Sequence, residues 1–143
     1  MEDARQLDRG RMLAEISNGM TRLHREAYGR GADSVRTIMQ RNYVCSFLEG
    51  IYTPVERTLL DAGEQEAVRG TRLAFQRAME GRFTELVEQA TGRKVAAFLS
   101  QVAFDPDVAA EIFVLEEQAN EPDGEGVGTA SARASGTETN TLA

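Results

Sequence analysis

The sequence predicts a single α+β domain, a two-layer sandwich with helices packed on one face of an antiparallel sheet of about four strands. Three observations predict it. Amphipathic helical repeats occupy the start and the middle of the chain, two pairs of apolar segments each flank a turn sequence, and together they give the order α-β-β-α-α-β-β. Strands joined by tight turns pair antiparallel. A chain of 143 residues with 41% hydrophobic content is sized for one core.

The N-terminal half contributes a helix and a hairpin. Apolar side chains recur at steps of three and four from about Ala4 to Tyr28, and the sequence GRG at 29–31 ends this helix. The segment from Ser34 to Arg41 alternates like a strand, although Ser34 also fits a helix cap, and we favour the strand. Tyr43 to Leu48 is dense in β-branched and aromatic residues, which indicates the second arm of the hairpin.

The C-terminal half contributes two helices and a second hairpin. The sequence TPVE at 53–56 supplies a Thr cap, a Pro at the first helical position and a Glu three residues after the cap, so a short helix to about Ala62 is expected. A longer helix follows from about Glu64 to Ala90, with Gly92 as its stop. Lys94 to Phe104 and Val108 to Leu115 then flank the turn sequence DPD.

The core is expected between the sheet and the long helix. Phe47 and Phe83 are assigned to it, one from the second strand and one from the apolar face of the helix. Gly70 and Gly81 weaken the helix, and we interpret them as points of close approach to a neighbouring element.

The distribution of charge argues against nucleic-acid binding. The formal net charge is -7, and residues 116–143 hold six acids against one arginine, so the folded part carries only about -2. Phosphate backbones are bound by broad basic surfaces, which this sequence lacks. The longest apolar run, from Val95 to Leu99, is far too short to span a bilayer, and the N-terminus lacks a secretion signal. A cytoplasmic protein is expected.

Two domain regions follow from composition. Residues 1–117 are expected to fold. Residues 118–143 are rich in Gly, Ser, Thr and Glu with almost no large apolar side chain, so they are expected to be a disordered acidic tail.

No catalytic, metal or cofactor site is predicted. Cys45 is the only cysteine and His24 the only histidine, which excludes a cysteine cluster or a His-rich zinc site. We expect Cys45 to be an inert packed thiol and His24 to be a polar or half-buried helix residue. A nucleophile with an adjacent base is not visible, and the protein is not expected to be an enzyme.

One group of arginine side chains is a candidate site for an anionic ligand. Forked guanidinium donors could hold a carboxylate, phosphate or bicarbonate if the turn and sheet bring them together. The alternative is that these arginines pair with local acids such as Asp33 or Glu49. The candidates for anion binding are Arg30, Arg36, Arg41 and Arg93.

Three segments together resemble the MpsC family over about residues 10–115. They are YGRGADSVRT, LEGIYTPVERTLL and the long helix closed by ATGRKVAAFLS. The chain departs from the family pattern at Ala32, where members often carry proline, and in its long tail. The resemblance implies a small accessory member of a sodium-translocating, membrane potential-generating system linked to inorganic-carbon uptake, beside membrane subunits. It implies no catalytic residue.

Three functions therefore remain open. The first is an accessory or regulatory protein that binds a protein partner, such as membrane transport subunits, with a homo-oligomer also open. The second is a small-anion sensor that uses Arg30 and Arg36, and the third is an enzyme of unfamiliar type. An exposed apolar patch or a free sheet edge favours the first, whereas a deep polar cleft favours the others.

Overall fold

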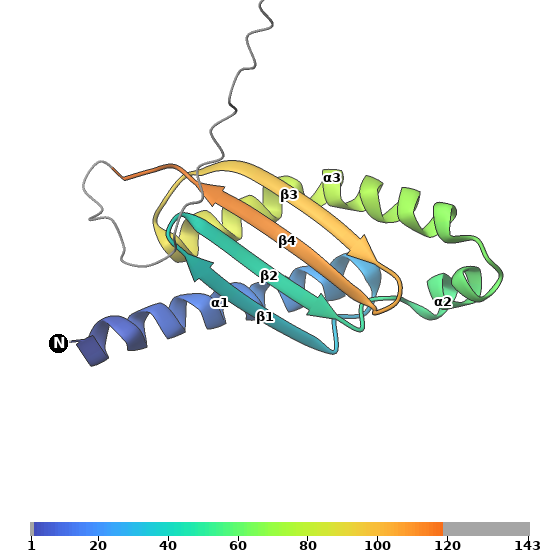
Figure 1. Cartoon of the computed structure of the whole chain (residues 1–143), viewed down its shortest axis with the longest axis horizontal. Coiled ribbons are helices and arrows are strands. Elements are labelled where there is room, and N and C mark those ends of the chain that lie inside the picture. Colours follow the sequence, from blue (N-terminus) through green and yellow to red (C-terminus); the bar gives the residue numbers. More distant parts are fainter. Residues whose placement is uncertain (1, 119–143) are drawn as a thin grey trace, which may run out of the picture.

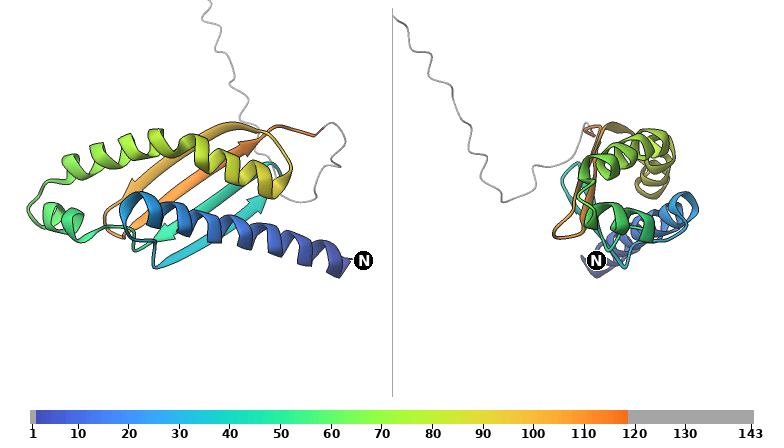
Figure 2. Two further views of the ribbon diagram at one scale, coloured as in Figure 1. Left: turned by 180° about the vertical axis from the view of Figure 1, so that it is seen from behind. Right: turned by 90° about the vertical axis from the view of Figure 1, so that its right-hand side faces the viewer.

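The computed structural model describes residues 2–118, which form a layer of strands and a layer of helices (Figure 1). The two layers are seen side by side in the right panel of Figure 2, where the helices lie on one side of the sheet. The elements are α1 (Glu2–Tyr28), β1 (Ser34–Gln40), β2 (Tyr43–Glu49), α2 (Pro54–Asp61), α3 (Gln65–Thr91), β3 (Val95–Ala103) and β4 (Val108–Leu115).

The predicted fold class and element order are confirmed. The capping box at Thr53 is formed, with Glu56 Oε1 accepting from the Thr53 N–H and Thr53 Oγ1 accepting from the Glu56 N–H. Gly92 ends α3 with a left-handed φ of 70°, where a glycine has no Cβ to clash. The predicted tail begins at residue 118, and all of it beyond that residue lies outside the described part of the chain.

The sheet joins two hairpins at their second strands. Its strand order is β1-β2-β4-β3, and all three pairings are antiparallel. Each half of the molecule therefore has the same plan, a long helix followed by a hairpin: α1 with β1 and β2, and α3 with β3 and β4. Both helices are 27 residues long, and both lie across the same face of the sheet (Figure 2).

The close approach between the long helices occurs on α1, so the prediction for the α3 glycines is wrong. A Cβ added at Gly19 would lie 2.4 Å from Leu86 Cδ1, whereas one added at Gly70 or Gly81 would meet nothing within 4 Å. Gly70 and Gly81 are exposed on the outer side of α3. Gly19 is buried and lets the Leu86 side chain of α3 sit against the α1 backbone.

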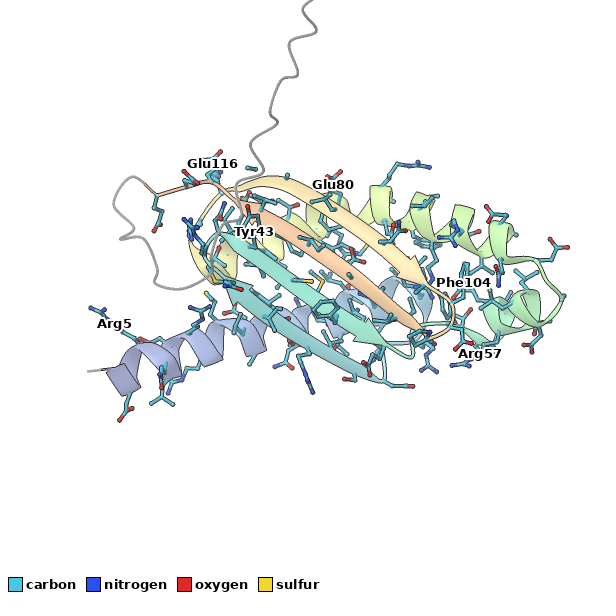
Figure 3. The ribbon with its side chains drawn as sticks, viewed as in Figure 1. Arg5, Tyr43, Arg57, Glu80, Phe104 and Glu116 are labelled. Atoms are coloured by element: carbon cyan, nitrogen blue, oxygen red, sulfur yellow. The ribbon has the colours of Figure 1, made fainter. Side chains whose placement is uncertain are left out.

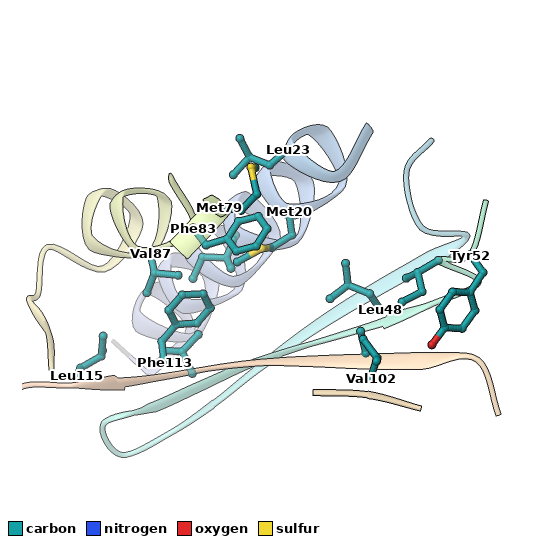
Figure 4. Packing of buried hydrophobic residues seen from close by; sticks show 14 of the residues in the cluster. Met20, Leu23, Leu48, Tyr52, Met79, Phe83, Val87, Val102, Phe113 and Leu115 are labelled. Atoms are coloured by element: carbon teal, nitrogen blue, oxygen red, sulfur yellow. The ribbon is translucent and has the colours of Figure 1, made fainter. Parts of the chain in front are cut away.

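The core lies between the helices and the inner face of the sheet (Figure 4). Phe83 is 1% exposed, as predicted, but Phe47 is 39% exposed and the prediction that it joins the core is wrong. Val44 and Leu48 of the same strand are fully buried. Since successive side chains of a strand point to opposite faces, Phe47 must lie on the face away from the helices.

Replacing the two phenylalanines with alanine should separate the two faces of the sheet. Phe83→Ala removes a buried ring and should cost about 3 to 5 kcal/mol of unfolding free energy. Phe47→Ala should cost much less, on the order of 1 kcal/mol, because part of the ring is already in water. Urea unfolding of both variants measures this. Equal losses would show that the open face is as well packed as the core.

Candidate functional site

A buried ion pair connects α2 to α3. Arg72 donates through Nε to Glu56 Oε2 at 2.6 Å and through Nη2 to Glu56 Oε1 at 2.5 Å. The same Nη2 donates to the Ile51 carbonyl oxygen at 2.8 Å. Both charged side chains are buried, and a forked guanidinium on a carboxylate is the strongest form of ion pair. The pair therefore fixes α3 to the loop that leaves β2.

Each member of the pair keeps the other charged. Burial by itself raises the pKa of Glu56, but hydrogen bonds from Arg72 and from the Thr53 N–H outweigh it, so the pKa is lowered. Burial opposes the charge of Arg72 as well, and Glu56 more than offsets it, so the pKa of Arg72 is raised. The guanidinium also lies 4.0 Å from the ring centroid of Tyr28 and 5.3 Å from that of Tyr52.

His24 lies deeper than expected. It is 4% exposed, stacks on Phe83 with ring centroids 5.1 Å apart, and its Nδ1–H donates to the Met20 carbonyl oxygen at 2.8 Å. Burial lowers the pKa of His24, and the charge of Arg72 lowers it further. The imidazole is therefore a neutral core ring, not the half-buried polar residue predicted, because α1 turns this side chain toward α3.

A row of polar side chains crosses the inner face of the sheet. Ser17 of α1 hydrogen-bonds Thr37 of β1 at 2.7 Å, and Thr37 hydrogen-bonds Ser46 of β2 at 2.8 Å. The strand register continues this row through Glu111 of β4 to Ser100 of β3. Polar side chains on all four strands thus lie beneath the helices.

Glu111 is the unusual member of this row. It is 1% exposed, and its Oε2 has no hydrogen-bond partner among the described residues. Burial raises its pKa to about 7, opposed by the nearby Ser100 hydroxyl and by the charge of Arg72. The carboxyl group therefore titrates near neutral pH inside the core.

The outer face of the sheet is apolar and uncovered. Ile38, Tyr43, Phe47 and Leu99 are 50%, 53%, 39% and 54% exposed, and all four point away from the helices. Figure 3 looks onto this face, with Tyr43 labelled at the start of β2. We call the surface formed by the outward side chains of the four strands the open face. The apolar residues of the open face are Ile38, Tyr43, Cys45, Phe47, Ala97, Leu99, Ala103, Val108, Ala110, Ile112 and Val114.

Cys45 lies on the open face and is half-buried. Burial raises the pKa of the thiol, and the charge of Glu111 raises it further. A raised pKa leaves less of the thiol in the nucleophilic thiolate form at neutral pH.

The four predicted arginines lie in different places. Arg30 donates to Asp33 Oδ1 at 2.6 Å and to the Gly50 carbonyl oxygen at 2.8 Å, which is the local pairing weighed as the alternative to an anion site. Arg36 lies on the open face beside Phe47. Arg41 occupies the β1–β2 turn, at the end of β1 opposite Arg30.

Arg93 precedes β3 and donates to the Glu116 carbonyl oxygen at 2.8 Å. The structure therefore spreads the four side chains over both ends and one face of the sheet, and no single site includes them all. Within residues 2–118, no group of three or more His, Cys, Asp or Glu side chains gathers as metal ligands would. None of the described helices is both long and apolar enough to cross a bilayer.

Comparison with known proteins identifies the family. Residues 8–117 match the family described as Na+-translocating membrane potential-generating system (MpsC). The chain belongs to the MpsC family. This MpsC-family chain is 30% identical over 92 residues to the uncharacterized protein YbcI of Bacillus subtilis, covering 63% of this chain and 73% of YbcI. It is 22% identical over 111 residues to the uncharacterized protein YrhF of the same organism, covering 76% of this chain and 91% of YrhF. No solved structure matches significantly.

The segments that carry the MpsC resemblance have structural roles in this chain. The GRG turn places Arg30 on Asp33, and Gly50 of the LEG sequence has a φ of 66°, where an added Cβ would lie 2.1 Å from Asp33 Oδ2. The TPVE sequence caps α2 and supplies Glu56 to Arg72. These motifs hold the ends of the sheet and helices together.

Sequence reasoning missed Arg72 and Glu111, although both carried a signal. Arg72 follows Val68 by four residues on the buried stripe of α3, where an arginine needs a partner. Glu111 lies between Ala109 and Phe113 at the inward positions of β4. A charged residue at an inward position of an apolar strand indicates a buried group, but not which side chains surround it.

The pH dependence of the unfolding free energy should reveal the titration of the Glu111 carboxyl group. Its folded pKa of about 7 exceeds the usual 4.5, so the contribution of Glu111 to stability is largest below pH 4.5 and falls as pH rises toward 7. At about 1.4 kcal/mol per unit of pKa shift, the loss between pH 5 and pH 8 should be roughly 2 to 3 kcal/mol. Glu111→Gln should remove this fall in urea titrations at pH 5 and pH 8. His24 acts with the opposite sign in both proteins and cancels in the difference. Parallel profiles would place the titration elsewhere.

Breaking the Arg72–Glu56 pair from one side should be more harmful than removing both charges. Arg72→Met leaves a buried carboxylate alone and should cost about 3 to 5 kcal/mol of unfolding free energy. Adding Glu56→Gln removes that charge but keeps an oxygen for the Thr53 N–H. The double variant should therefore lose less than the sum of the single losses, by roughly 1 to 3 kcal/mol in a urea-based double-mutant cycle. Strict additivity would mean that the two groups do not interact.

Proposed function

We propose that this chain is an accessory component of a membrane potential-generating system and that it acts through protein contacts without catalysing a reaction. The family supplies the system, because MpsC members are described by it. The observation that carries the mode of action is the open face. Apolar side chains extend over all four strands there, and the helices cover only the opposite face.

An uncovered apolar surface of this extent is typical of a protein interface. Soluble proteins rarely leave a continuous apolar patch of several hundred Å² in water, and such patches mark interaction sites. Tyr43 and Phe47 belong to the residue types enriched at interface centres. Charged groups are sparse on the open face: Arg36 and Glu49 are its only charged strand residues within the described part of the chain.

Deletion of the gene in its own host tests the role. Loss of the chain should reduce the sodium-dependent part of the membrane potential, measured with a potentiometric dye, and the wild-type gene should restore it. Leu99→Glu should fail to restore it, because a charge in the open face costs desolvation at any apolar interface. Val55→Glu is the matched control, since Val55 is an apolar residue 71% exposed on α2 and lies off the open face.

Glu111→Gln tests the non-catalytic part of the proposal. It removes the buried group that titrates near neutral pH, so it should restore the membrane potential as well as the wild type does. A potential unchanged by deletion of the gene would contradict the accessory role. Failure of Glu111→Gln at normal protein levels would contradict the non-catalytic mode of action.

A further inference from the structure

We propose that the open face is covered by a second copy of this chain, in a twofold dimer whose two sheets pack face to face. The dimer rests on the proposed function, which treats the open face as a protein-contact surface, and it identifies a second copy of the chain as the protein in contact. Sheets that pack face to face lie about 10 Å apart with side chains interdigitated. The dimer would then be two sheets inside and two helical layers outside.

The register of the strands makes the centre of the open face apolar. One row of side chains crosses all four strands, and each residue in it is paired directly with the next one on the adjacent strand. This central row consists of Ile38, Cys45, Ile112 and Leu99. Tyr43 and Phe47 lie two residues to either side of Cys45 on β2. A twofold axis through the central row therefore places apolar side chains of one copy on apolar side chains of the other.

The charges of the open face permit self-association. Arg36 and Glu49 lie toward one end of the face, and their charges sum to zero. Two copies of a neutral face meet without net repulsion at the contact, although each whole chain carries a formal charge of -7. Because like charge outside the contact is screened by salt, the dimer should tighten as salt is added. An interface held by ion pairs would weaken instead.

The size of the open face is sufficient for a specific dimer. Strands roughly 4.8 Å apart and about seven residues long at about 3.3 Å per residue give a four-stranded face of about 400 Å². Two such faces, with their side chains, remove on the order of 1,000 Å² from water. This is close to the lower limit for biological interfaces, so a concentration-dependent dimer is expected.

Two other occupants of the open face fit less well. The sequence after residue 118 has Val127 and Leu142 as its only large apolar residues, too few to replace water over the face. An anionic lipid surface is bound by clusters of basic residues, and the face carries Arg36 alone among its strand residues. A second copy supplies an apolar surface of matching size.

The oligomeric state of the full chain tests the proposal. Sedimentation equilibrium should give a dimer of the 15.7 kDa chain at high concentration, dissociating on dilution and strengthening with added sodium chloride. Leu99→Glu should shift the dissociation constant upward at least tenfold. Ile38→Lys, on a different strand of the central row, should do the same. Both side chains are about half exposed, so circular dichroism and urea midpoints should confirm that the variants fold.

Val55→Glu is again the control and should dimerise like the wild type. A wild-type chain that stays monomeric at high concentration would overturn the proposal, as would a dimer that Leu99→Glu and Ile38→Lys leave intact. If the chain is monomeric but deletion of its gene lowers the membrane potential, the dimer is rejected and the proposed function stands. If the chain is a dimer but deletion of its gene leaves the potential unchanged, the proposed function is rejected and the dimer stands.

Discussion

The fold depends on the two hydrogen bonds that join Arg72 to Glu56. Glu56 also closes the capping box of α2, and Arg72 also holds the Ile51 carbonyl at the exit of β2. One carboxylate and one guanidinium therefore join the exit of β2, helix α2 and helix α3. Because both groups are buried, each needs the other. The eight-residue helix α2 presents Glu56 to this contact and packs Leu59 and Leu60 against the core.

The sheet has an unusual distribution of polarity between its two faces. Its middle row on the helix side is Thr37, Ser46, Glu111 and Ser100, whereas the adjacent row on the open side is Ile38, Cys45, Ile112 and Leu99. Sheets with one face in water usually carry apolar residues inward and polar residues outward. This reversal at the centre of the sheet buries polar groups beneath the helices and leaves apolar side chains exposed on the open face.

The sequence predicted the elements well because their signals are local. The TPVE cap, the stop at Gly92 and the DPD turn each lie within a few residues of the structure that they specify. The face of β2 could not be predicted, since Tyr43 and Phe47 are as apolar as Val44 and Leu48, and alternation does not say which set the helices cover. The Arg72–Glu56 contact and the pairing of β2 with β4 depend on distant residues, and no local pattern reports them.

The two-hairpin plan has a consequence for how the chain is made. The first half, α1 with β1 and β2, is synthesised before α3, β3 and β4, yet within residues 2–118 the sheet joins the two halves solely through the pairing of β2 with β4. At roughly 5 to 20 residues per second, seconds pass before β4 leaves the ribosome. During that time the backbone edge of β2 is unpaired and Leu48 lacks its neighbour Ala109. A chaperone, or the nascent chain of an adjacent ribosome, has access to that edge during this interval, before β4 covers it.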